Sequence, residues 1–317
     1  MGPYHTPVLL KEAISSLRCQ SGGIYVDGTV GGGGHARRIL ETTEPDGLLI
    51  GLDRDDDALR ESEKNLASFG TRKILRKANF SQISEILTDL GISKVDGILL
   101  DLGVSSHQLD TPERGFSFTA ADSLPDMRMD QEQESGAYEF INRASKEELS
   151  KVIWEYGEEI MAGRIARAIV RARRTSPIMT TASLSDIVVQ ALPPDQRNRK
   201  IHPATKTFQA IRIRVNDELN SLEQGISSGM DKLKEGGRFS IISFQSLEDR
   251  IVKNAFRLWS KHCVCPPGIP ICTCGHQPKL RVLTTKPVTP TTTEITMNPR
   301  ARSARSTAAA TSAVRYL

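Results

Sequence analysis

Residues able to do chemistry occur in four groups along this chain, and the first is a run of glycines. Gly31 to Gly34 are followed directly by His35. Glycine lets a ligand come close to the main chain. A glycine-rich turn between a strand and a helix also offers amide N–H groups to polar ligand atoms. The pattern fits a nucleotide-type cofactor site, and its alternative is a flexible loop that binds nothing.

Acidic residues close two apolar runs that follow the glycines. Asp53 ends the run that begins at Leu48, and Asp101 ends the run that begins at Val95. Ligands of open α/β sheets bind at the carboxyl ends of the strands, so the glycine turn, Asp53 and Asp101 are expected to meet in one crevice. A carboxylate at the position of Asp53 can accept both ribose hydroxyls of an adenosine. This pattern fits NAD and S-adenosylmethionine alike, and the alternative for Asp53 is a solvated loop acid or a helix N-cap.

Basic residues form the third group. Four arginines at 3-4-3 spacing share one helix face, and no acid lies among them: Arg164, Arg167, Arg171 and Arg174. Residues 143–214 hold 14 Lys and Arg against 7 Asp and Glu, an excess larger than the net charge of +4 of the whole chain. Such a face is typical of phosphate binding, so we predict that it contacts RNA together with Lys206. The alternative is a solvated charged face.

Cysteines form the fourth group. Cys263, Cys265, Cys272 and Cys274 have the spacing C-x-C-x6-C-x-C. Four thiolates can bind a structural zinc ion tetrahedrally, although the single-residue spacing is tighter than in most zinc ribbons. The alternative is four reduced cysteines in a small surface lobe.

The elements that must position these residues alternate between strand and helix. Apolar runs predict strands at Ile24–Asp27, Leu48–Asp53, Lys73–Ala78, Val95–Asp101 and Gly237–Phe244. Amphipathic or helix-compatible segments predict helices at Ala36–Glu41, Asp55–Phe69, Ser81–Leu90 and Ser246–Ser260. A further long helix is expected over Ala204–Lys234, broken near Gly225 and Gly229. This rhythm favours a doubly wound, Rossmann-like parallel sheet.

The alternation stops after the fourth strand, which indicates an insertion. Residues 109–134 are polar and rich in turn formers, and residues 135–200 are predicted to be helical without strands. We therefore expect a discontinuous sheet domain, 1–108 and 204–298, with a helical insertion at 109–203 that recognises RNA. The segment 299–317, rich in Arg, Ser, Ala and Thr, is expected to be a flexible basic tail.

Composition narrows the class of protein. The chain has 317 residues, 38% hydrophobic and 25% charged, which is an ordinary globular balance. The first residues lack the charged and apolar regions of a signal peptide, and no apolar run is long enough for a membrane span. Four of the five cysteines lie in one short segment, which is not the pattern of a secreted protein held together by disulfides. We expect a soluble, cytoplasmic protein without a membrane partner.

Seven ordered motifs resemble the MraW/RsmH family. They are DGTVGGGGH at 27–35, DLGVSSHQLD at 101–110, ERGFSF at 113–118, DMRMD at 126–130, HPATKTFQAIR at 202–212, IISFQSLEDR at 241–250 and NPRARS at 298–303. The resemblance extends from His5 to about Ser303, nearly the whole chain. That family comprises S-adenosylmethionine-dependent enzymes that methylate N4 of a cytidine in the decoding region of small-subunit ribosomal RNA.

The resemblance implies a class I methyltransferase sheet, S-adenosylmethionine as cofactor, and 16S rRNA or the small ribosomal subunit as partner. It also implies the cofactor contacts, which are Gly33, Gly34, His35, Asp53, Phe80, Asp101 and Gln108. Physical reasons agree at three of them. Phe80 can flank the adenine, although core packing is its ordinary use. His35 and Gln108 can hydrogen-bond the methionyl tail of the cofactor.

Methyl transfer to a cytosine amine needs help from the protein, because the nitrogen lone pair is conjugated with the ring. In-line approach to the sulfonium and a hydrogen-bond acceptor for the amine both assist, and the target base must be unstacked. Our hypothesis gives Asp101 the role of orienting the amine or the cofactor. The alternatives are a DNA amino-methyltransferase, a non-catalytic RNA-binding protein and a dehydrogenase. The first has an Asp/Asn-Pro-Pro-aromatic motif, where this chain has Asp101-Leu-Gly-Val.

Overall fold

Two compact units make up the chain. The computed structural model describes residues 7–118, 122–197, 201–266 and 271–311. A sheet unit comprises Met1–Gly103 and Leu219–Leu317, and a helical unit comprises Val104–Glu218. The helical unit is thus inserted into the sheet unit by two chain connections.

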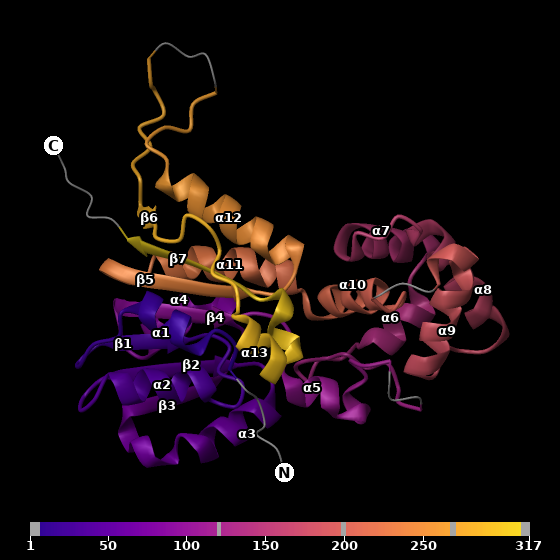
Figure 1. The fold of residues 1–317 in the computed structure, drawn as a ribbon, viewed down its shortest axis with the longest axis horizontal. Coiled ribbons are helices and arrows are strands. Elements are labelled where there is room, and N and C mark those ends of the chain that lie inside the picture. Colours follow the sequence, from indigo (N-terminus) through magenta and orange to yellow (C-terminus); the bar gives the residue numbers. More distant parts are fainter. Residues whose placement is uncertain (1–6, 119–121, 198–200, 267–270, 312–317) are drawn as a thin grey trace. The chain divides into compact units, whose positions relative to one another are not determined.

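The sheet unit is built on one mixed sheet, drawn in Figure 1. Within the described residues the sheet has seven strands in the order β3-β2-β1-β4-β5-β7-β6. Neighbours from β3 to β5 pair in parallel, whereas β7 is antiparallel to both β5 and β6. The strands are β1 (Ile24–Asp27), β2 (Leu48–Asp53), β3 (Lys73–Lys77), β4 (Val95–Asp101), β5 (Leu233–Ser243), β6 (Leu280–Val282) and β7 (Arg305–Thr311).

Helices cover both faces of this sheet. One core cluster joins the strands to α4 (Ile83–Asp89), α11 (Glu218–Met230) and α12 (Ser246–Ser260). The other joins them to α1 (Leu10–Leu17), α2 (Gly34–Thr42) and the turn η1 (Ala67–Arg72). The remaining elements of the unit are α3 (Asp56–Asn65), η2 (Phe80–Gln82), α13 (Thr292–Met297) and η5 (Pro299–Ser303). Residues such as Leu99 and Leu100 alternate between the two clusters, as a strand buried on both faces requires.

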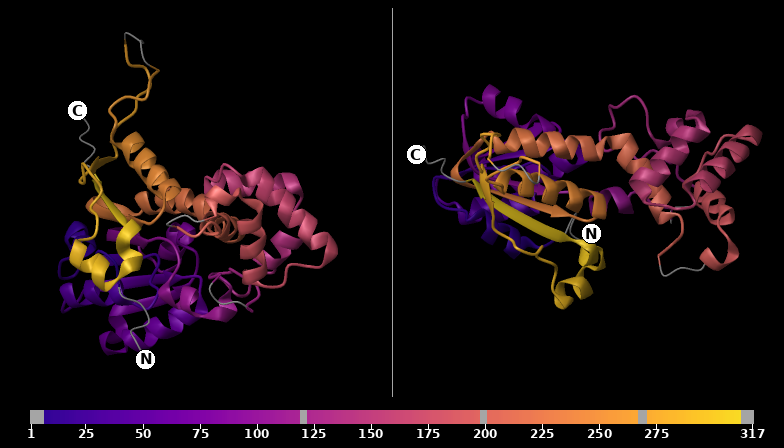
Figure 2. Two further views of the ribbon diagram at one scale, coloured as in Figure 1. Left: turned by 45° about the vertical axis from the view of Figure 1, so that its right-hand side comes forward. Right: turned by 90° about the horizontal axis from the view of Figure 1, so that it is seen from above.

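The helical unit has a separate hydrophobic core. Its elements are α5 (Ser106–Asp110), η3 (Pro112–Arg114), α6 (Ala137–Arg143), α7 (Lys146–Gly157), α8 (Ala162–Thr175), α9 (Thr181–Ala191), η4 (Pro194–Gln196) and α10 (Thr205–Asn216). Ile165 and Ile169 of α8 are fully buried in this core, one turn apart on the face that points inward. Figure 2 shows these helices from two further directions.

The predicted α/β fold is confirmed, and several elements match to the residue. Strands Ile24–Asp27, Leu48–Asp53 and Val95–Asp101 and the helix Ser246–Ser260 have the bounds that the sequence predicts. The three strands are continuous apolar runs and the helix is amphipathic. The local sequence pattern is therefore sufficient to predict their bounds. The predicted helix over 55–69 is shorter, because it ends at Asn65 and continues as η1.

The predicted long helix over 204–234 is wrong in its break and in its end. The break falls at Asp217, whose φ is 48°, and residues from Leu233 onward belong to β5. The two glycines that were expected to break it lie inside α11. A Cβ at Gly225 would lie 2.5 Å from Cδ2 of Phe80, and one at Gly229 would lie 3.0 Å from Cε1 of Phe239. They are therefore sites of close ring packing rather than breaks.

The helix α10 also lies in a different domain from the one expected. The sequence assigned residues from 204 onward to the sheet domain, with an insertion at 109–203. In the structure α10 packs against α7 and α6 and contributes Phe208 and Ile211 to the helical core. The 3.6-residue pattern identifies a helix but does not say which core it faces.

The expectation of a flexible tail at 299–317 is wrong for the residues described there. Residues 299–303 form η5, and β7 follows between β5 and β6 with Ser306 to Ala310 buried. Arg305 holds this strand to α12 through Asp249, with an N–O distance of 3.1 Å. Small residues suit such a strand because its stability comes from backbone pairing on both sides. Residues 312–317 lie outside the described part of the chain.

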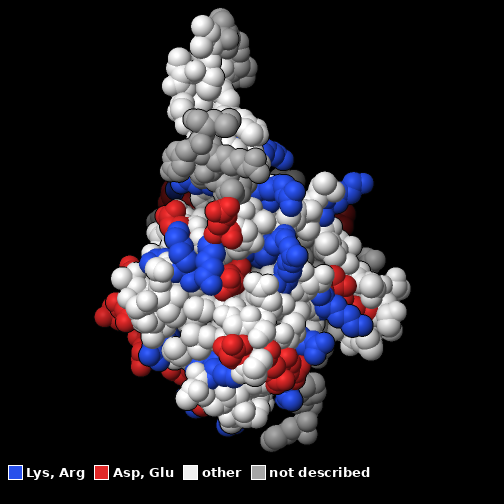
Figure 3. All heavy atoms as spheres, turned by 90° about the vertical axis from the view of Figure 1, so that its left-hand side faces the viewer, with Lys and Arg blue, Asp and Glu red and all other residues white. Residues whose placement is uncertain are grey.

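The segment between α12 and β6 projects from the sheet unit, and we call residues 261–279 the cysteine lobe. It is the excursion at the end of α12 in Figure 1. In Figure 3 the described residues of this projection are white beyond its base, whereas blue and red residues are interspersed on the body below it. Among the helices that the structure describes, none is long and apolar enough to cross a membrane.

Removing β7 tests its place in the sheet. A chain shortened after Ala304 loses the backbone hydrogen bonds to β5 and β6, each contributing about 1 kcal/mol. We expect such a chain to be insoluble or to lose cooperative urea unfolding, measured by circular dichroism. A chain shortened after Thr311 keeps β7 and serves as the control, expected to unfold like the full chain. Equal stability of the two shortened chains would contradict the role of β7.

Candidate active site

Three carboxyl groups lie at the carboxyl ends of adjacent strands, and we call Asp27, Asp53 and Asp101 the acidic edge. Asp27 pairs in register with Gly51 of β2 and Leu99 of β4. Asp53 and Asp101 therefore stand two residues beyond Asp27 on its two neighbouring strands. Side chains two residues apart point to the same side of a strand. The sequence prediction that Asp53 and Asp101 share one edge with the glycine turn is thus reproduced by the geometry.

Asp53 ties the glycine turn to β2. Its two carboxylate oxygens accept hydrogen bonds from the amides of Gly31 at 2.9 Å and Asp55 at 3.0 Å. The helix α3 holds the other side of the turn, because Ser62 and Asn65 donate to the carbonyls of Gly31 and Gly32. The turn is therefore fixed rather than flexible. Each oxygen of Asp53 retains a second lone pair for a ligand hydroxyl.

His35 and Thr29 fix the position of Asp101. His35 Nε2 lies 3.0 Å from the carbonyl of Val8, so this nitrogen is the donor. The other ring nitrogen, Nδ1, faces Asp101 Oδ2 at 3.6 Å. The amide of Asp101 donates to Thr29 Oγ1 at 2.7 Å. The ring thus lies directly beside the carboxyl group of Asp101, and its predicted contact with a cofactor tail stays a prediction.

Electrostatics at the acidic edge favour a positively charged ligand. Burial raises the pKa of Asp27 to about 7 and that of Asp53 to about 6. Burial, followed by the carboxyls of Asp27 and Glu248, raises the pKa of Asp101 well above its usual range. Asp27 Oδ2 and Asp101 Oδ1 are buried without a hydrogen-bond partner among the described residues. A cation or hydroxyl donor would satisfy both atoms.

The other predicted contacts in the sheet unit lie around the same edge. Gly33 has a φ of 84° and is the N-cap of α2, so glycine is required there, and Gly34 begins the helix. Phe80 follows β3, and its Cβ is 3.0 Å from where a side chain at Gly28 would begin. Phe80 also packs in the core against Gly225. Core packing of this ring is therefore present, and adenine contact stays a prediction.

Gln108 belongs to the helical unit, where it has a local structural role. Its side-chain carboxamide oxygen accepts a hydrogen bond from the backbone amide of Ser105 at 3.0 Å. The backbone amide of Gln108 donates to the Ser105 hydroxyl at 3.1 Å. This reciprocal pair caps α5. The side chain is 5% exposed. Its predicted contact with the cofactor stays a prediction.

Two acidic residues at this site were not among the predicted site residues. Asp27 ends an apolar strand in the same way as Asp53 and Asp101, so the signal that found those two also applies to it. Glu248 is 3% exposed in α12, where its carboxylate accepts from the amides of Phe244 and Gln245. Glu248 lies within the motif at 241–250, but its effect on the pKa of Asp101 comes from an element remote in sequence, which the local pattern does not predict.

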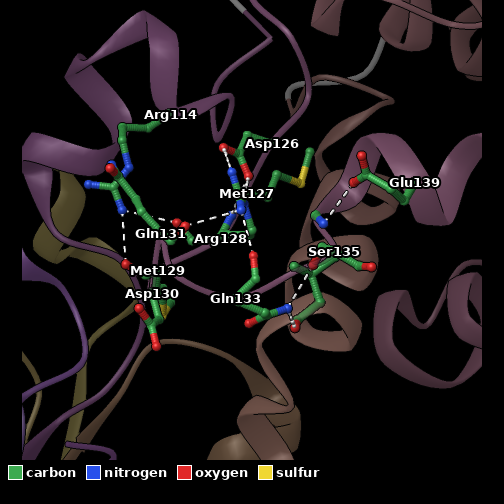
Figure 4. Close-up of polar contacts among 12 residues, drawn as sticks. Arg114, Asp126, Met127, Arg128, Met129, Asp130, Gln131, Gln133, Ser135 and Glu139 are labelled. Carbon is green, nitrogen blue, oxygen red and sulfur yellow. Dashed lines mark hydrogen bonds and ion pairs between the residues drawn. The ribbon is translucent and has the colours of Figure 1, made fainter.

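A second set of motif residues in the helical unit builds a rigid loop, shown in Figure 4. There Arg128 lies between Asp126 and the carbonyl groups of Gln131 and Gln133. Arg114 is 4% exposed and donates to the carbonyls of Arg128 and Met129. The guanidinium groups of both arginines thus donate hydrogen bonds within the loop, which indicates that the motif at 126–130 has a structural role.

The four arginines on α8 are exposed, as the spacing predicts. Three of them, Arg164, Arg167 and Arg171, line a groove with Gln190 and Ala191 of α9. In the described part of the chain none of the four arginines forms an ion pair, and no acid lines the groove. Lys206 differs from them, because its amine donates to the carbonyl of Glu158 at the end of α7 at 2.8 Å.

The order of strands and the edge they form define a class. A parallel sheet in this order, extended by the antiparallel β7 and carrying a glycine turn beside strand-end acids, is the fold of class I S-adenosylmethionine-dependent methyltransferases. Residues 3–311 match the MraW methylase family, and the chain belongs to this family. The family resemblance of the seven motifs is confirmed.

Similar proteins cover nearly the whole chain. Ribosomal RNA small subunit methyltransferase H of Syntrophus aciditrophicus is 58% identical over 302 residues, which are 95% of this chain and 96% of that protein. The protein of the same name from Geotalea daltonii is 54% identical, with 95% and 96% covered. That from Symbiobacterium thermophilum is 50% identical, with 96% and 95% covered.

The buried carboxyl of Asp27 predicts a pH dependence of stability. Because its pKa is raised in the folded chain, the protonated form favours folding, and stability falls as the pH rises from about 4 to about 7. The free energy of unfolding is measured by urea titration without cofactor. Across this window it should fall by up to about 4 kcal/mol less in Asp27→Asn than in the wild type. Asp186→Asn, at an exposed position on α9, is the control and should follow the wild type. Parallel curves for the wild type and Asp27→Asn would refute this account.

Proposed function

We propose that this chain transfers a methyl group from S-adenosylmethionine to N4 of a cytidine in the decoding region of 16S rRNA. The observation that carries the reaction is the acidic edge, with two buried oxygens, Asp27 Oδ2 and Asp101 Oδ1, that lack partners among the described residues. The substrate is supported by relatives named as small-subunit ribosomal RNA methyltransferases that span nearly the whole chain. The small ribosomal subunit is then the proposed partner.

The residues present fit S-adenosylmethionine. The cofactor carries a sulfonium and an amino group, both positive, together with two ribose hydroxyls. Asp53 accepts the ribose hydroxyls, and Gly33 and Gly34 leave room for close approach beside the start of α2. Phe80 supplies an apolar ring to the adenine. When bound, the cofactor supplies an activated methyl group, and its positive charge favours the ionised form of the buried carboxyls.

Asp101 is the residue proposed to act on the acceptor. His35 faces Oδ2, which leaves Oδ1 to accept a hydrogen bond from the cytosine amine. Such a bond draws the nitrogen lone pair out of conjugation and aligns it toward the methyl carbon. With S-adenosylmethionine bound, the nitrogen–carbon bond would form as the methyl–sulfur bond breaks, so the cofactor would leave as a neutral thioether. The methylated amine would then give its proton to solvent water. The ionised Asp101 holds the amine throughout this step.

The basic face of α8 is proposed to bind the RNA backbone. The groove lined by Arg164, Arg167 and Arg171 has the charge that phosphates require, and these side chains are exposed without ion pairs within the described residues. Arg174 continues the face by one turn. Lys206 is retained as a weaker contact, because its amine already pairs with the carbonyl of Glu158.

Asp101→Asn tests the reaction. With saturating S-adenosylmethionine we expect methyl incorporation into small ribosomal subunits to fall by about 100-fold or more, because the amide is a weaker acceptor. The measurement is transfer of a labelled methyl group, with the modified nucleoside identified by mass spectrometry. Full transfer by this variant would remove Asp101 from the role. Wild-type methylation of DNA instead, or of nothing, would favour the alternative classes.

Charge reversal tests the RNA surface separately. Arg167→Glu with Arg171→Glu should weaken RNA binding and lower the slope of log affinity against log salt by about 2, one for each lost phosphate contact. Arg60→Glu with Lys64→Glu, on the exposed face of α3, makes the same change in net charge and is the control. An unchanged salt slope in the α8 variant contradicts the proposed surface.

A further inference from the structure

The cysteine lobe contains a set of side chains that the proposed methyl transfer does not use. Cys263, Cys265, Cys272 and Cys274 bring their four Sγ atoms within 4.8 Å of one another. The atoms come from two chain segments, residues 263–265 and 272–274. Neighbouring sulfur distances are 3.9 Å between Cys265 and Cys272, 3.5 Å between Cys272 and Cys274, and 3.9 Å between Cys274 and Cys263.

These distances distinguish between the chemical states of the four thiols. A disulfide requires a separation of about 2.05 Å, so the four are free cysteines. Zinc binds thiolates at about 2.3 Å in tetrahedral geometry, which places neighbouring sulfurs about 3.8 Å apart. The three separations given above are therefore close to the edge length of a zinc–thiolate tetrahedron, and every other pair of the four sulfurs lies within 4.8 Å.

Backbone amides support the sulfur atoms. The amide of Cys265 donates to Cys263 Sγ at 3.4 Å, and that of Val264 donates to Cys274 Sγ at 3.5 Å. Donors of this kind stabilise thiolates and orient them as metal ligands. Within the described residues His262 and His276 are not part of the converging group. The ligand set is thus four sulfurs, which leaves no open position for a substrate or water.

The lobe has little else to order it. In its described residues there is no helix or strand, and no hydrophobic side chain is buried. Val264 is 41% exposed and Ile271 is 76% exposed. From 262 to 278 the sequence contains no Lys, Arg, Asp or Glu, which leaves the projection uncharged in Figure 3. A segment without a core or ion pairs needs a cross-link to hold one conformation.

The base of the lobe is attached to the sheet unit. The amide of Lys279 donates to the carbonyl of Trp259 at 2.8 Å, which closes the excursion between the end of α12 and the start of β6. Leu280, the next residue, is buried in the core. The two ends of the lobe are therefore fixed to the sheet unit.

We propose that Cys263, Cys265, Cys272 and Cys274 bind one zinc ion as a structural site. The four thiolates fill the coordination sphere, so the ion orders the lobe and takes no part in methyl transfer. This site is independent of the proposed function, since it shares no residue with the acidic edge.

Metal analysis of the full chain tests the site. Wild-type protein purified under reducing conditions without chelator should hold about one zinc per chain by mass spectrometry, and replacement by cobalt should give thiolate-to-cobalt absorption. Cys272→Ser with Cys274→Ser should lose the zinc, whereas Cys19→Ser, outside the lobe, should keep it. Iron in place of zinc would overturn the assignment, as would wild-type protein that neither contains nor takes up zinc.

A second experiment uses only the wild-type protein, so its result does not depend on correct folding of the variant. With zinc bound, the four lobe thiols should resist alkylation, and a chelator should release one zinc and expose all four together. Hydrogen exchange should then rise in the described residues 261–266 and 271–279 and stay unchanged in the strands of the sheet. Four thiols that react freely before chelation would exclude the site.

Discussion

Repulsion among buried carboxyl groups is the constraint on which the site depends. Asp27, Asp53 and Asp101 approach one another because three adjacent parallel strands each end in an aspartate, and Glu248 approaches from a helix. Burial alone raises the pKa of such groups, and proximity raises it further for Asp101. The apo site therefore favours protons where the bound site needs negative charge. A positively charged donor resolves this conflict, because it favours the ionised form of the carboxyls.

The rest of the sheet unit holds these groups in place without neutralising them. Asp53 is fixed by amides of the glycine turn, and Asp101 is fixed by Thr29 and His35. None of these partners is a lysine or arginine. The strands position the three carboxyl groups, and the flanking helices pack against the sheet. The helical unit carries the exposed arginines of α8. The acidic edge thus belongs to the sheet unit, and the groove lined by Arg164, Arg167 and Arg171 belongs to the helical unit.

Sequence reasoning succeeded where one local property decides the structure. Continuous apolar runs gave β1, β2 and β4 their bounds, and the rule for strand ends placed Asp53 and Asp101 on one edge. Prediction from the sequence failed where contacts between residues far apart in the chain determine the structure. Small residues at 305–311 form a strand that pairs with β5 and β6 on its two sides, and glycine is needed at 225 because the ring of Phe80 leaves no room for a Cβ. Glu248 and the domain of α10 belong to the same kind of failure.

The acidic edge also has a consequence for the life of the protein in the cell. A ligand that binds only the folded chain raises its resistance to unfolding in proportion to the logarithm of the free ligand concentration. Chains that lack the methyl donor miss this stabilisation, so we expect them to unfold more often and to be cleaved more readily by proteases. Resistance of the folded chain to proteolysis is therefore expected to rise with the concentration of free methyl donor.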